Sequence, residues 1–255
     1  MQTYTPTDGL LRDRAILVTG AGDGIGRAAS LAFAAHGATV VLLGRTLKKL
    51  EQTYDAIEEA GYPQPAIFPM NLESTHQQEY EAVADTIERE FGRLDGLLHN
   101  AAELLLLSRI DDYDLESWNR VLQVNLTAPF LLTQACLPLL RQAPDASILF
   151  TSDRVGRRGK AYWGAYGVSK FGLEGLMQIL AEETRGSSHI RVNSIAPGPV
   201  RTNLRAKAYP GENPEHLPTA DSIMPLYLYL MGPDSIGVTG QAFDAQADTQ
   251  ESPQQ

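Results

Sequence analysis

One glycine-rich turn constrains the fold of this 255-residue chain more than any other feature. It follows residues 15–18, a short apolar run typical of a buried strand, and leads into residues 24–36, which carry apolar side chains at helical spacing. Between a strand and a helix, such a turn lets backbone N–H groups and the helix N-terminus approach a pyrophosphate. The residues expected to bind a dinucleotide here are Thr19, Gly20, Gly24, Ile25 and Gly26.

Strand patterns and helical patterns alternate along most of the chain. The predicted strands are residues 15–18, 39–43, 66–70, 94–99, 147–151 and 191–196. The predicted helices are residues 24–36, 47–60, 74–91, 118–140 and 162–183. Because this alternation implies right-handed crossovers and a parallel sheet covered on both faces, we expect a three-layer, doubly wound α/β sheet of the Rossmann type.

The length of the chain suits one α/β domain, so we expect residues 1–255 to form a single dinucleotide-binding and catalytic domain. Residues 1–12 are interpreted as an N-terminal extension and residues 246–255 as a flexible tail, because residues 2–9 and the tail offer little apolar surface to bury. Residues 203–219 are rich in proline and glycine and are expected to form the variable lid over the substrate.

The composition argues against several classes of function. Lys and Arg number 21 against 31 Asp and Glu, so the net charge of −10 argues against nucleic acid as a partner. The chain shows no secretory signal, and no stretch approaches the roughly 20 apolar residues that span a bilayer. Cys136 is the only cysteine, and no histidine lies at metal-binding spacing. We therefore expect a cytoplasmic protein with no membrane attachment and no bound metal.

The residues just after the second predicted strand, Gly44 and Arg45, bear on the choice of cofactor. An acid at this point accepts hydrogen bonds from the ribose of NAD, whereas an arginine binds the 2′-phosphate of NADP. The chain has Arg45 there and no acid, so we expect NADP(H) in preference to NAD(H). Asp23 in the glycine turn argues the other way, because its charge would lie near the same phosphate. A solvated Arg45 without a ligand is the alternative.

Tyr166 and Lys170 lie one helical turn apart, so their side chains share one face of the helix predicted over residues 162–183. An ammonium held near a phenol favours the ionised phenol. A tyrosine pKa starts near 10, so ionisation at neutral pH needs about 4 kcal/mol, most of which one nearby cation can supply. The pair therefore predicts that Tyr166 acts as a general acid or base.

Four features together resemble the short-chain dehydrogenase/reductase family: the glycine turn, Asn125, Tyr166-x-x-x-Lys170 and residues 197–202. The resemblance covers nearly the whole chain and implies hydride transfer between NADP(H) and a small-molecule carbonyl or alcohol. It also implies that Tyr166 exchanges a proton with the substrate, that Lys170 lowers the tyrosine pKa and binds the nicotinamide ribose, and that Asn125 holds a relay water. The further cofactor contacts that it implies are Asn71, Leu72, Asn100, Ala101, Pro197, Gly198, Val200 and Thr202.

The most serious departure from the family pattern is Asp153. The family serine that donates a hydrogen bond to the substrate carbonyl lies thirteen residues before the tyrosine, which is the position of Asp153. An ionised carboxylate roughly 4 Å from a developing oxyanion would cost about 4 kcal/mol, or about a thousandfold in rate. Three alternatives follow: a working enzyme with a protonated or displaced Asp153, Ser152 in the serine role after a backbone shift, or little catalysis.

There are two smaller departures, and one lies at the end of the fourth predicted strand, where the chain has His99-Asn100-Ala101-Ala102. Ala102 stands where the family has glycine and adds a Cβ beside the expected cofactor path. His99 is expected to be a packing or hydrogen-bonding residue rather than a catalyst. Asn71 replaces the usual aspartate at the adenine, and its amide oxygen can still accept a hydrogen bond.

The segment before the tyrosine helix is basic, with Arg154, Arg157, Arg158 and Lys160. These side chains could face an anionic substrate, or they could be solvated or salt-bridged. The resemblance implies that the helices over residues 118–140 and 162–183 form a subunit interface, so we expect a homodimer or homotetramer.

The leading hypothesis is an NADP(H)-dependent carbonyl reductase or alcohol dehydrogenase. The alternative is an NADP(H)-binding regulatory or scaffold protein with little turnover, because Asp153 replaces the family serine. Residues 224–246 are similar to a bacterial subgroup of the family described only as oxidoreductases, and this similarity names no substrate.

Overall fold

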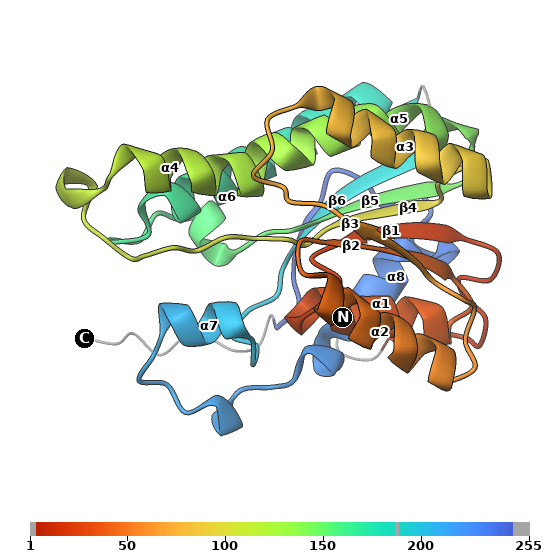
Figure 1. The fold of residues 1–255 in the computed structure, drawn as a ribbon, viewed down its shortest axis with the longest axis horizontal. Coiled ribbons are helices and arrows are strands. Elements are labelled where there is room, and N and C mark those ends of the chain that lie inside the picture. Colours follow the sequence, from red (N-terminus) through yellow and green to blue (C-terminus); the bar gives the residue numbers. More distant parts are fainter. Residues whose placement is uncertain (1–3, 187–188, 247–255) are drawn as a thin grey trace.

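The computed structural model describes residues 4–186 and 189–246, and it is built on a seven-stranded sheet in the order β3-β2-β1-β4-β5-β6-β7 (Figure 1). Every neighbouring pair of strands runs parallel. The strands are β1 (Ala15–Thr19), β2 (Thr39–Gly44), β3 (Ala66–Pro69), β4 (Gly96–His99), β5 (Ala146–Thr151), β6 (Ile190–Ala196) and β7 (Ala242–Asp244).

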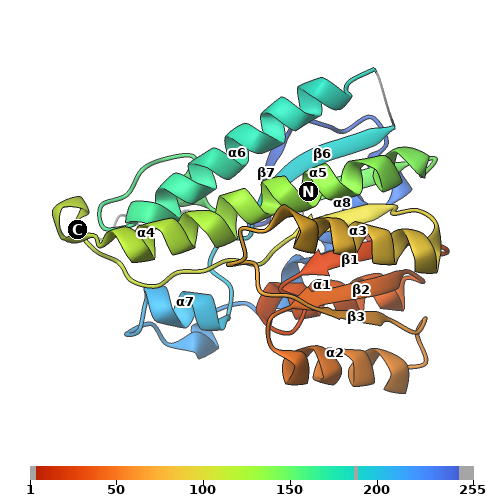
Figure 2. The same ribbon diagram turned by 45° about the horizontal axis from the view of Figure 1, so that its top comes forward.

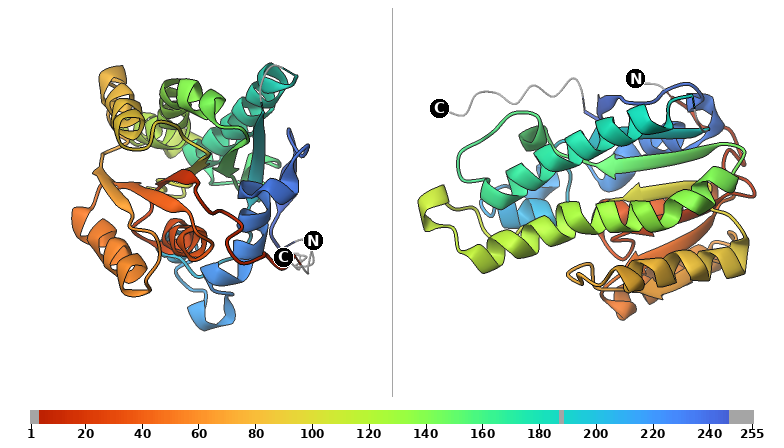
Figure 3. Two further views of the ribbon diagram at one scale, coloured as in Figure 1. Left: turned by 90° about the vertical axis from the view of Figure 1, so that its right-hand side faces the viewer. Right: turned by 90° about the horizontal axis from the view of Figure 1, so that it is seen from above.

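Helices cover both faces of the sheet (Figure 3). One face carries α1 (Gly24–Ala35), α2 (Leu47–Glu59) and α8 (Met224–Met231). The other face carries α3 (Gln77–Phe91), α4 (Leu115–Leu122), α5 (Ala128–Gln142) and α6 (Gly164–Thr184). The short helix α7 (Asn203–Ala208) belongs to neither layer and lies beyond the sheet (Figure 2). Single 3-10 turns occupy Ile110–Asp112, Arg154–Gly156, Pro214–His216, Ala220–Ile223 and Pro233–Ser235.

The central strands are apolar on both faces because helices bury both faces. All five residues of β1 are buried: Leu17 packs into the cluster with α3, α5 and α6, whereas Ile16 and Val18 pack into the cluster with α1 and α8. Successive side chains of a strand point to opposite faces, so one apolar run serves both cores. The predicted doubly wound parallel sheet is confirmed.

The strand order reverses between β1 and β4, because β1 pairs with β2 on one side and with β4 on the other. In open parallel sheets, ligands bind at such a reversal, in the crevice outside the carboxyl ends of the strands. The glycine turn follows β1 and residues 100–104 follow β4, so both lie at this edge.

One predicted helix is interrupted at a site residue. The helix expected over residues 118–140 is instead α4, a π-helical turn at Gln123–Thr127, and α5. Pro129 lies four residues after Asn125 and has no N–H to donate to the Asn125 carbonyl, which removes one normal helix hydrogen bond. The wider turn therefore falls at Asn125, and π-turns are often found at functional sites.

Several segments differ from the sequence-based expectation. The strand and helix patterns did not predict α7, α8 or β7. Within the N-terminal extension, the Tyr4 hydroxyl donates to Asp234 and Leu11 is fully buried. In the predicted tail, Gln246 donates to the carbonyls of Pro197 and Pro199, and residues 247–255 lie outside the described residues.

No helix in the described ranges has the length and apolar character needed to span a membrane. Residues 4–186 and 189–246 also hold no cluster of three or more His, Cys, Asp or Glu side chains suited to a metal ion.

Candidate active site

A cleft of about 830 Å³ opens at the carboxyl ends of the strands, under α7. Most of the predicted site residues line it: Gly20, Gly24, Ile25, Arg45, Asn71, Leu72, Asn100, Ala101, Ser152, Asp153, Tyr166, Lys170, Pro197, Gly198, Val200 and Thr202. Three predicted residues, Thr19, Gly26 and Asn125, are not among the lining residues and instead support its walls.

Thr19 joins the two strands that flank the cleft. Its Oγ1 accepts hydrogen bonds from the backbone N–H groups of Asn100 at 2.9 Å and Ala101 at 3.0 Å, and donates to the Leu98 carbonyl at 3.3 Å. The side chain is buried, so these bonds are sheltered from water. The end of β1 and the segment after β4 are thereby held at fixed separation.

The glycine turn needs glycine for two physical reasons. Gly20 and Gly24 have φ of +69° and +51°, a region that other residues rarely adopt. At Gly26 an added Cβ would lie 2.2 Å from the Gly20 carbonyl oxygen, so only glycine allows this close approach. The turn is therefore fixed by backbone geometry.

Asp23 in the glycine turn has its charge compensated. It caps α1 by accepting from the Gly24 N–H, its Oδ2 lies 2.5 Å from the Lys49 ammonium, and the Asn203 amide donates to the same oxygen at 2.7 Å. Partial burial acts to raise the pKa of Asp23, but these hydrogen bonds together lower it. The contact with Asn203 links the turn to the first residue of α7.

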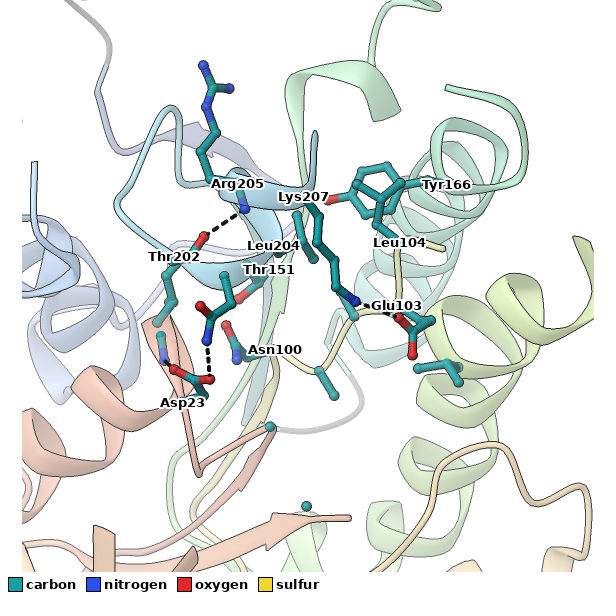
Figure 4. Close-up of a pocket in the computed structure, with 18 of the residues that line it drawn as sticks. Asp23, Asn100, Glu103, Leu104, Thr151, Tyr166, Thr202, Leu204, Arg205 and Lys207 are labelled. Atoms are coloured by element: carbon teal, nitrogen blue, oxygen red, sulfur yellow. Dashed lines mark hydrogen bonds and ion pairs between the residues drawn. The ribbon is translucent and has the colours of Figure 1, made fainter. Parts of the chain in front are cut away.

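Arg45 lies at the rim of the cleft among acidic side chains. Its guanidinium is 3.4 Å from Glu73 and 3.2 Å from Glu103, and more than half of the side chain is exposed. Glu103 is buried and also lies 3.5 Å from Arg120 and 3.7 Å from Lys207, which reaches across the cleft from α7 (Figure 4). Sequence reasoning missed Lys49, Glu103 and Lys207, because no local motif marks them.

The Asn125 side chain holds the cleft wall together. Its Oδ1 accepts from the Glu103 N–H at 2.7 Å, and its amide donates to the Glu103 carbonyl and to Ser169 Oγ, both at 3.0 Å. These contacts occupy both amide hydrogens and join the segment after β4 to α6. The relay-water role of Asn125 stays a prediction.

Tyr166, Lys170 and Asp153 meet at the other end of the cleft. Tyr166 is 3% exposed and Lys170 2%, and the Lys170 ammonium lies 5.5 Å from the centre of the tyrosine ring. Lys170 donates to the Thr151 carbonyl at 2.7 Å. The Tyr166 hydroxyl donates to Asp153 Oδ2 at 3.2 Å, and Asp153 Oδ1 accepts from the Val155 N–H at 3.0 Å. The predicted neighbours are brought together, and Asp153 points toward the tyrosine.

The electrostatics of this group differ from the expectation. Burial, followed by the charge and hydrogen bond of Asp153, raises the pKa of Tyr166 well above its ordinary value of 10.0. Burial also lowers the pKa of Lys170 to about 8, although the carboxylates of Asp153 and Glu174 act in the opposite direction. The prediction of a lowered tyrosine pKa is therefore wrong for this arrangement, because burial and then Asp153 favour the neutral phenol.

Ser152 and His99 take different places around the site. Ser152 lines the cleft with 2% exposure, and among the described residues its buried Oγ has no hydrogen-bond partner. The His99 ring contacts Thr133 at 2.8 Å and stacks on Phe150, and burial lowers its pKa to about 3. His99 is a packing residue, as expected.

A second cavity of about 600 Å³ shares part of its wall with the cleft, including Asp153, Trp163 and Tyr209. It is lined by the cations Arg154, Arg158, Lys160 and Arg205. Within the predicted basic segment, Arg157 is salt-bridged to Glu174 at 3.0 Å and does not line this cavity. The basic segment is thus divided between a structural contact and a cavity beside Tyr166.

The cleft fits a dinucleotide that bears a phosphate. The glycine turn presents backbone at one end, Arg45 provides a guanidinium at the rim, and the unpartnered Ser152 hydroxyl lies at the far end. An unpartnered buried hydroxyl is rare in folded proteins, and a ligand that accepts a hydrogen bond would satisfy it.

Known proteins share both the sequence and the fold. The short chain dehydrogenase family model matches residues 14–213. The Escherichia coli K12 protein named uncharacterized oxidoreductase YciK is 49% identical over 243 residues, which cover 95% of this chain and 96% of that protein.

Two solved structures are similar over nearly the full chain. A short chain dehydrogenase structure from Pseudomonas syringae has a TM-score of 0.93 at 54% identity, covering 96% of this chain and 100% of that one. A Shigella flexneri short chain dehydrogenase complexed with NADP has a TM-score of 0.91 at 48% identity, covering 94% and 100%.

Proposed function

The chain belongs to the short chain dehydrogenase family, and we propose that it transfers a hydride between NADP(H) and the carbonyl or alcohol group of a small molecule. One observation carries this proposal: Tyr166 and Lys170 are buried side by side at one end of a cleft whose other end is the glycine turn. The NADP complex of the similar Shigella flexneri protein supports the choice of cofactor.

The residues that would hold the cofactor lie along the whole cleft. Gly20 and Gly24 offer backbone to the pyrophosphate, and Arg45 would exchange its long contacts with Glu73 and Glu103 for a 2′-phosphate. When bound, NADPH supplies the hydride. Lys170 would keep its bond to Thr151 and offer its remaining hydrogens to ribose hydroxyls.

Tyr166 acts as a general acid in the reductive direction. Its raised pKa keeps the phenol protonated, which is the state required to give a proton to a substrate oxygen. Oxidation of an alcohol would require the phenolate, which burial and Asp153 disfavour. The direction that we propose at neutral pH is therefore reduction.

Phenylalanine at position 166 tests this role. Carbonyl-dependent oxidation of NADPH should fall by about 10²- to 10⁴-fold in Tyr166→Phe, because general acid catalysis contributes about that much. The affinity for NADPH, followed by its fluorescence, should stay unchanged. The exposed Tyr62→Phe is the matched control and should retain full activity. An unchanged rate in Tyr166→Phe would refute the assigned role.

The rival function is an NADP(H)-binding regulatory or scaffold protein with little turnover. The observation that favours it is the hydrogen bond that commits the Tyr166 hydroxyl to Asp153. Asp153→Ser separates the two: if the native chain binds NADPH but oxidises it with neither a carbonyl nor an imine panel, and the serine variant turns over the carbonyl panel, the regulatory function is correct.

The substrate of the proposed reaction carries an anionic group. Arg158 and Lys160 line the second cavity, and the described contacts of Arg158 include no salt bridge. Lys160 donates to the Tyr209 hydroxyl at 3.1 Å, which holds the ammonium at the wall. In Arg158→Ala the KM for a carboxylate-bearing ketone should rise, whereas the KM for a neutral ketone should not.

The proposal extends to a soluble, cytoplasmic homodimer or homotetramer with residues 203–219 as the lid. The exposed apolar side chains Phe130, Val168, Phe171 and Ile179 on α5 and α6 support an interface between copies of the chain. Within the lid, α7 carries Leu204 and Lys207 into the cleft wall. Analytical ultracentrifugation of native protein and Phe171→Glu would test the interface.

A further inference from the structure

Four carboxylates line the cleft, and three of them lie beside a lysine or arginine. Asp23 lies beside Lys49, Glu73 beside Arg45 and Arg120, and Glu103 beside Arg45, Arg120 and Lys207. Among the described residues, no lysine or arginine nitrogen lies within 4.0 Å of an Asp153 oxygen. Asp153 is therefore the one cleft carboxylate without an ion pair in the part of the chain that the structure describes.

The Asp153 carboxylate is also fixed in place. Oδ1 caps the 3-10 turn at Arg154–Gly156 by accepting from Val155, and Oδ2 accepts from the Tyr166 hydroxyl. A carboxylate has about four acceptor sites, so two contacts leave capacity for a ligand hydrogen. The group is partly buried, where an uncompensated charge is unfavourable unless a cation joins it.

The negative charge of Asp153 determines which substrate group the site favours. Near a carbonyl, an ionised Asp153 repels the oxygen that becomes negative during reduction, which slows the reaction by about a thousandfold at roughly 4 Å. Near a protonated carbon–nitrogen double bond, the same carboxylate attracts the positive charge and accepts the N–H hydrogen. We propose that this site reduces protonated imines in preference to ketones, with Asp153 as the residue that binds the iminium nitrogen.

This inference rests on the proposed function for its reductant, NADPH. The hydride adds to the imine carbon, the π pair of the C=N bond becomes the lone pair of the amine nitrogen, and NADPH becomes NADP⁺. The iminium already carries its proton, so no proton transfer from Tyr166 is needed in that step. Tyr166 instead acts as a positioning residue for Asp153 through their 3.2 Å hydrogen bond.

The aromatic wall suits a cation as well. Trp163 lines both cavities beside Asp153, and its ring centre lies 5.4 Å from that of Tyr166 and 6.1 Å from that of Tyr209. The face of a tryptophan attracts a cation. The cations Arg158 and Lys160 lie in the second cavity, where they can bind an anionic group elsewhere on the same substrate.

The first test measures binding without turnover. Protein saturated with NADP⁺ is titrated with the ammonium ion of 1,2,3,4-tetrahydroisoquinoline and with the neutral 1-tetralol by calorimetry. The native chain should bind the ammonium at least about 10-fold more tightly, and Asp153→Asn should lose that preference while keeping an oxygen for the Val155 N–H. Equal affinities in the native chain, or a preference that survives in Asp153→Asn, would overturn the inference.

The second test compares matched substrates in reactions started with NADPH. The native chain should reduce 3,4-dihydroisoquinoline faster than 1-tetralone, and Asp153→Ser should reverse this order. Tyr166→Phe should lower 1-tetralone reduction by a larger factor than 3,4-dihydroisoquinoline reduction, because only the ketone needs a proton from the phenol. A native chain that prefers the ketone overturns the imine inference and leaves the proposed function standing. A folded native chain that fails to bind NADPH overturns both.

Discussion

The two ends of the cleft are built on different principles. At the glycine turn, backbone geometry sets the shape and Lys49 compensates the charge of Asp23. At the Tyr166 end, the shape comes from α6, but the chemistry depends on Asp153, a charged side chain without an ion pair in the described residues. The cofactor end therefore tolerates little change in shape, whereas the reacting end is sensitive to the charge of Asp153.

The largest effect is expected from a substitution in the glycine turn at the cofactor end of the cleft. In Gly26→Ala the new Cβ would lie 2.2 Å from the Gly20 carbonyl oxygen and 2.6 Å from the Asn100 amide. Overpacking typically destabilises a fold by about 1–3 kcal/mol, and NADPH binding should be lost because the turn must shift. Urea unfolding and fluorescence titration measure the two effects.

Gly211→Ala is the matched control for the cofactor end. Gly211 is exposed, does not line the cleft, and an added Cβ there would meet no atom within 4 Å. This variant should therefore keep the stability and the NADPH binding of the native chain. Equal damage in Gly26→Ala and Gly211→Ala would show that the tight turn is not special.

At the reacting end, the coupled charges of Lys170 and Asp153 should appear in the pH dependence of the activity. Burial lowers the folded-state pKa of Lys170 to about 8, so activity that needs the ammonium should fall about tenfold per pH unit above that value. Since Asp153 acts to raise this pKa, Asp153→Asn should move the alkaline limb to lower pH. A limb that stays fixed in Asp153→Asn would show that the two charges are not coupled.

Lys170 should also change the pH dependence of stability. Its pKa is about 8 when folded against 10.5 as the ordinary value, so the unfolded chain binds more protons between these values. The free energy of unfolding should therefore rise from about pH 8 to pH 10.5, by about 3 kcal/mol relative to Lys170→Met. Urea unfolding at several pH values measures this difference, and parallel curves for the two proteins would contradict it.

A smaller effect is expected at the cofactor end when Arg45 is replaced. Its guanidinium is more than half exposed, so Arg45→Ala should weaken NADPH binding by about tenfold and leave NADH nearly unchanged. Arg89→Ala on the surface of α3 is the control, since the described contact of Arg89 is with the neighbouring Glu90. Equal losses for both cofactors would mean that Arg45 does not read the 2′-phosphate.

The smallest effect concerns the link between the lid and the glycine turn. Asn203 donates to Asp23 from the start of α7, and a solvent-exposed hydrogen bond is worth about 1 kcal/mol or less. Asn203→Ala should therefore raise the NADPH dissociation constant about two- to fivefold. The exposed Asn119→Ala on α4 should leave it unchanged.

The sequence was most informative where short-range rules determine structure. The glycine turn and the Tyr166–Lys170 pair follow from local spacing, and counting back from Tyr166 identified Asp153 at the reacting end. By contrast, α8 has apolar residues on all sides and shows no clear period, and β7 is three residues long at the sheet edge. Such elements are formed by tertiary packing rather than by their own pattern.

Charge partners were the other feature that the sequence did not reveal. Lys49, Glu103 and Lys207 come from segments far apart in the chain and meet only across the cleft. The raised pKa of Tyr166 came first from burial and then from the orientation of Asp153, neither of which a spacing rule specifies. Sequence therefore predicted which residues gather at the site more reliably than the electrostatic balance among them.

A crystal structure of the native protein with NADPH tests the central claim most directly. The pyrophosphate should lie on the glycine turn, the 2′-phosphate on Arg45, and the nicotinamide ring beside Tyr166, Lys170 and Asp153. A nicotinamide ring outside the cleft, or an Asp153 turned away from it, would contradict the assignment of this end of the cleft as the site of hydride transfer.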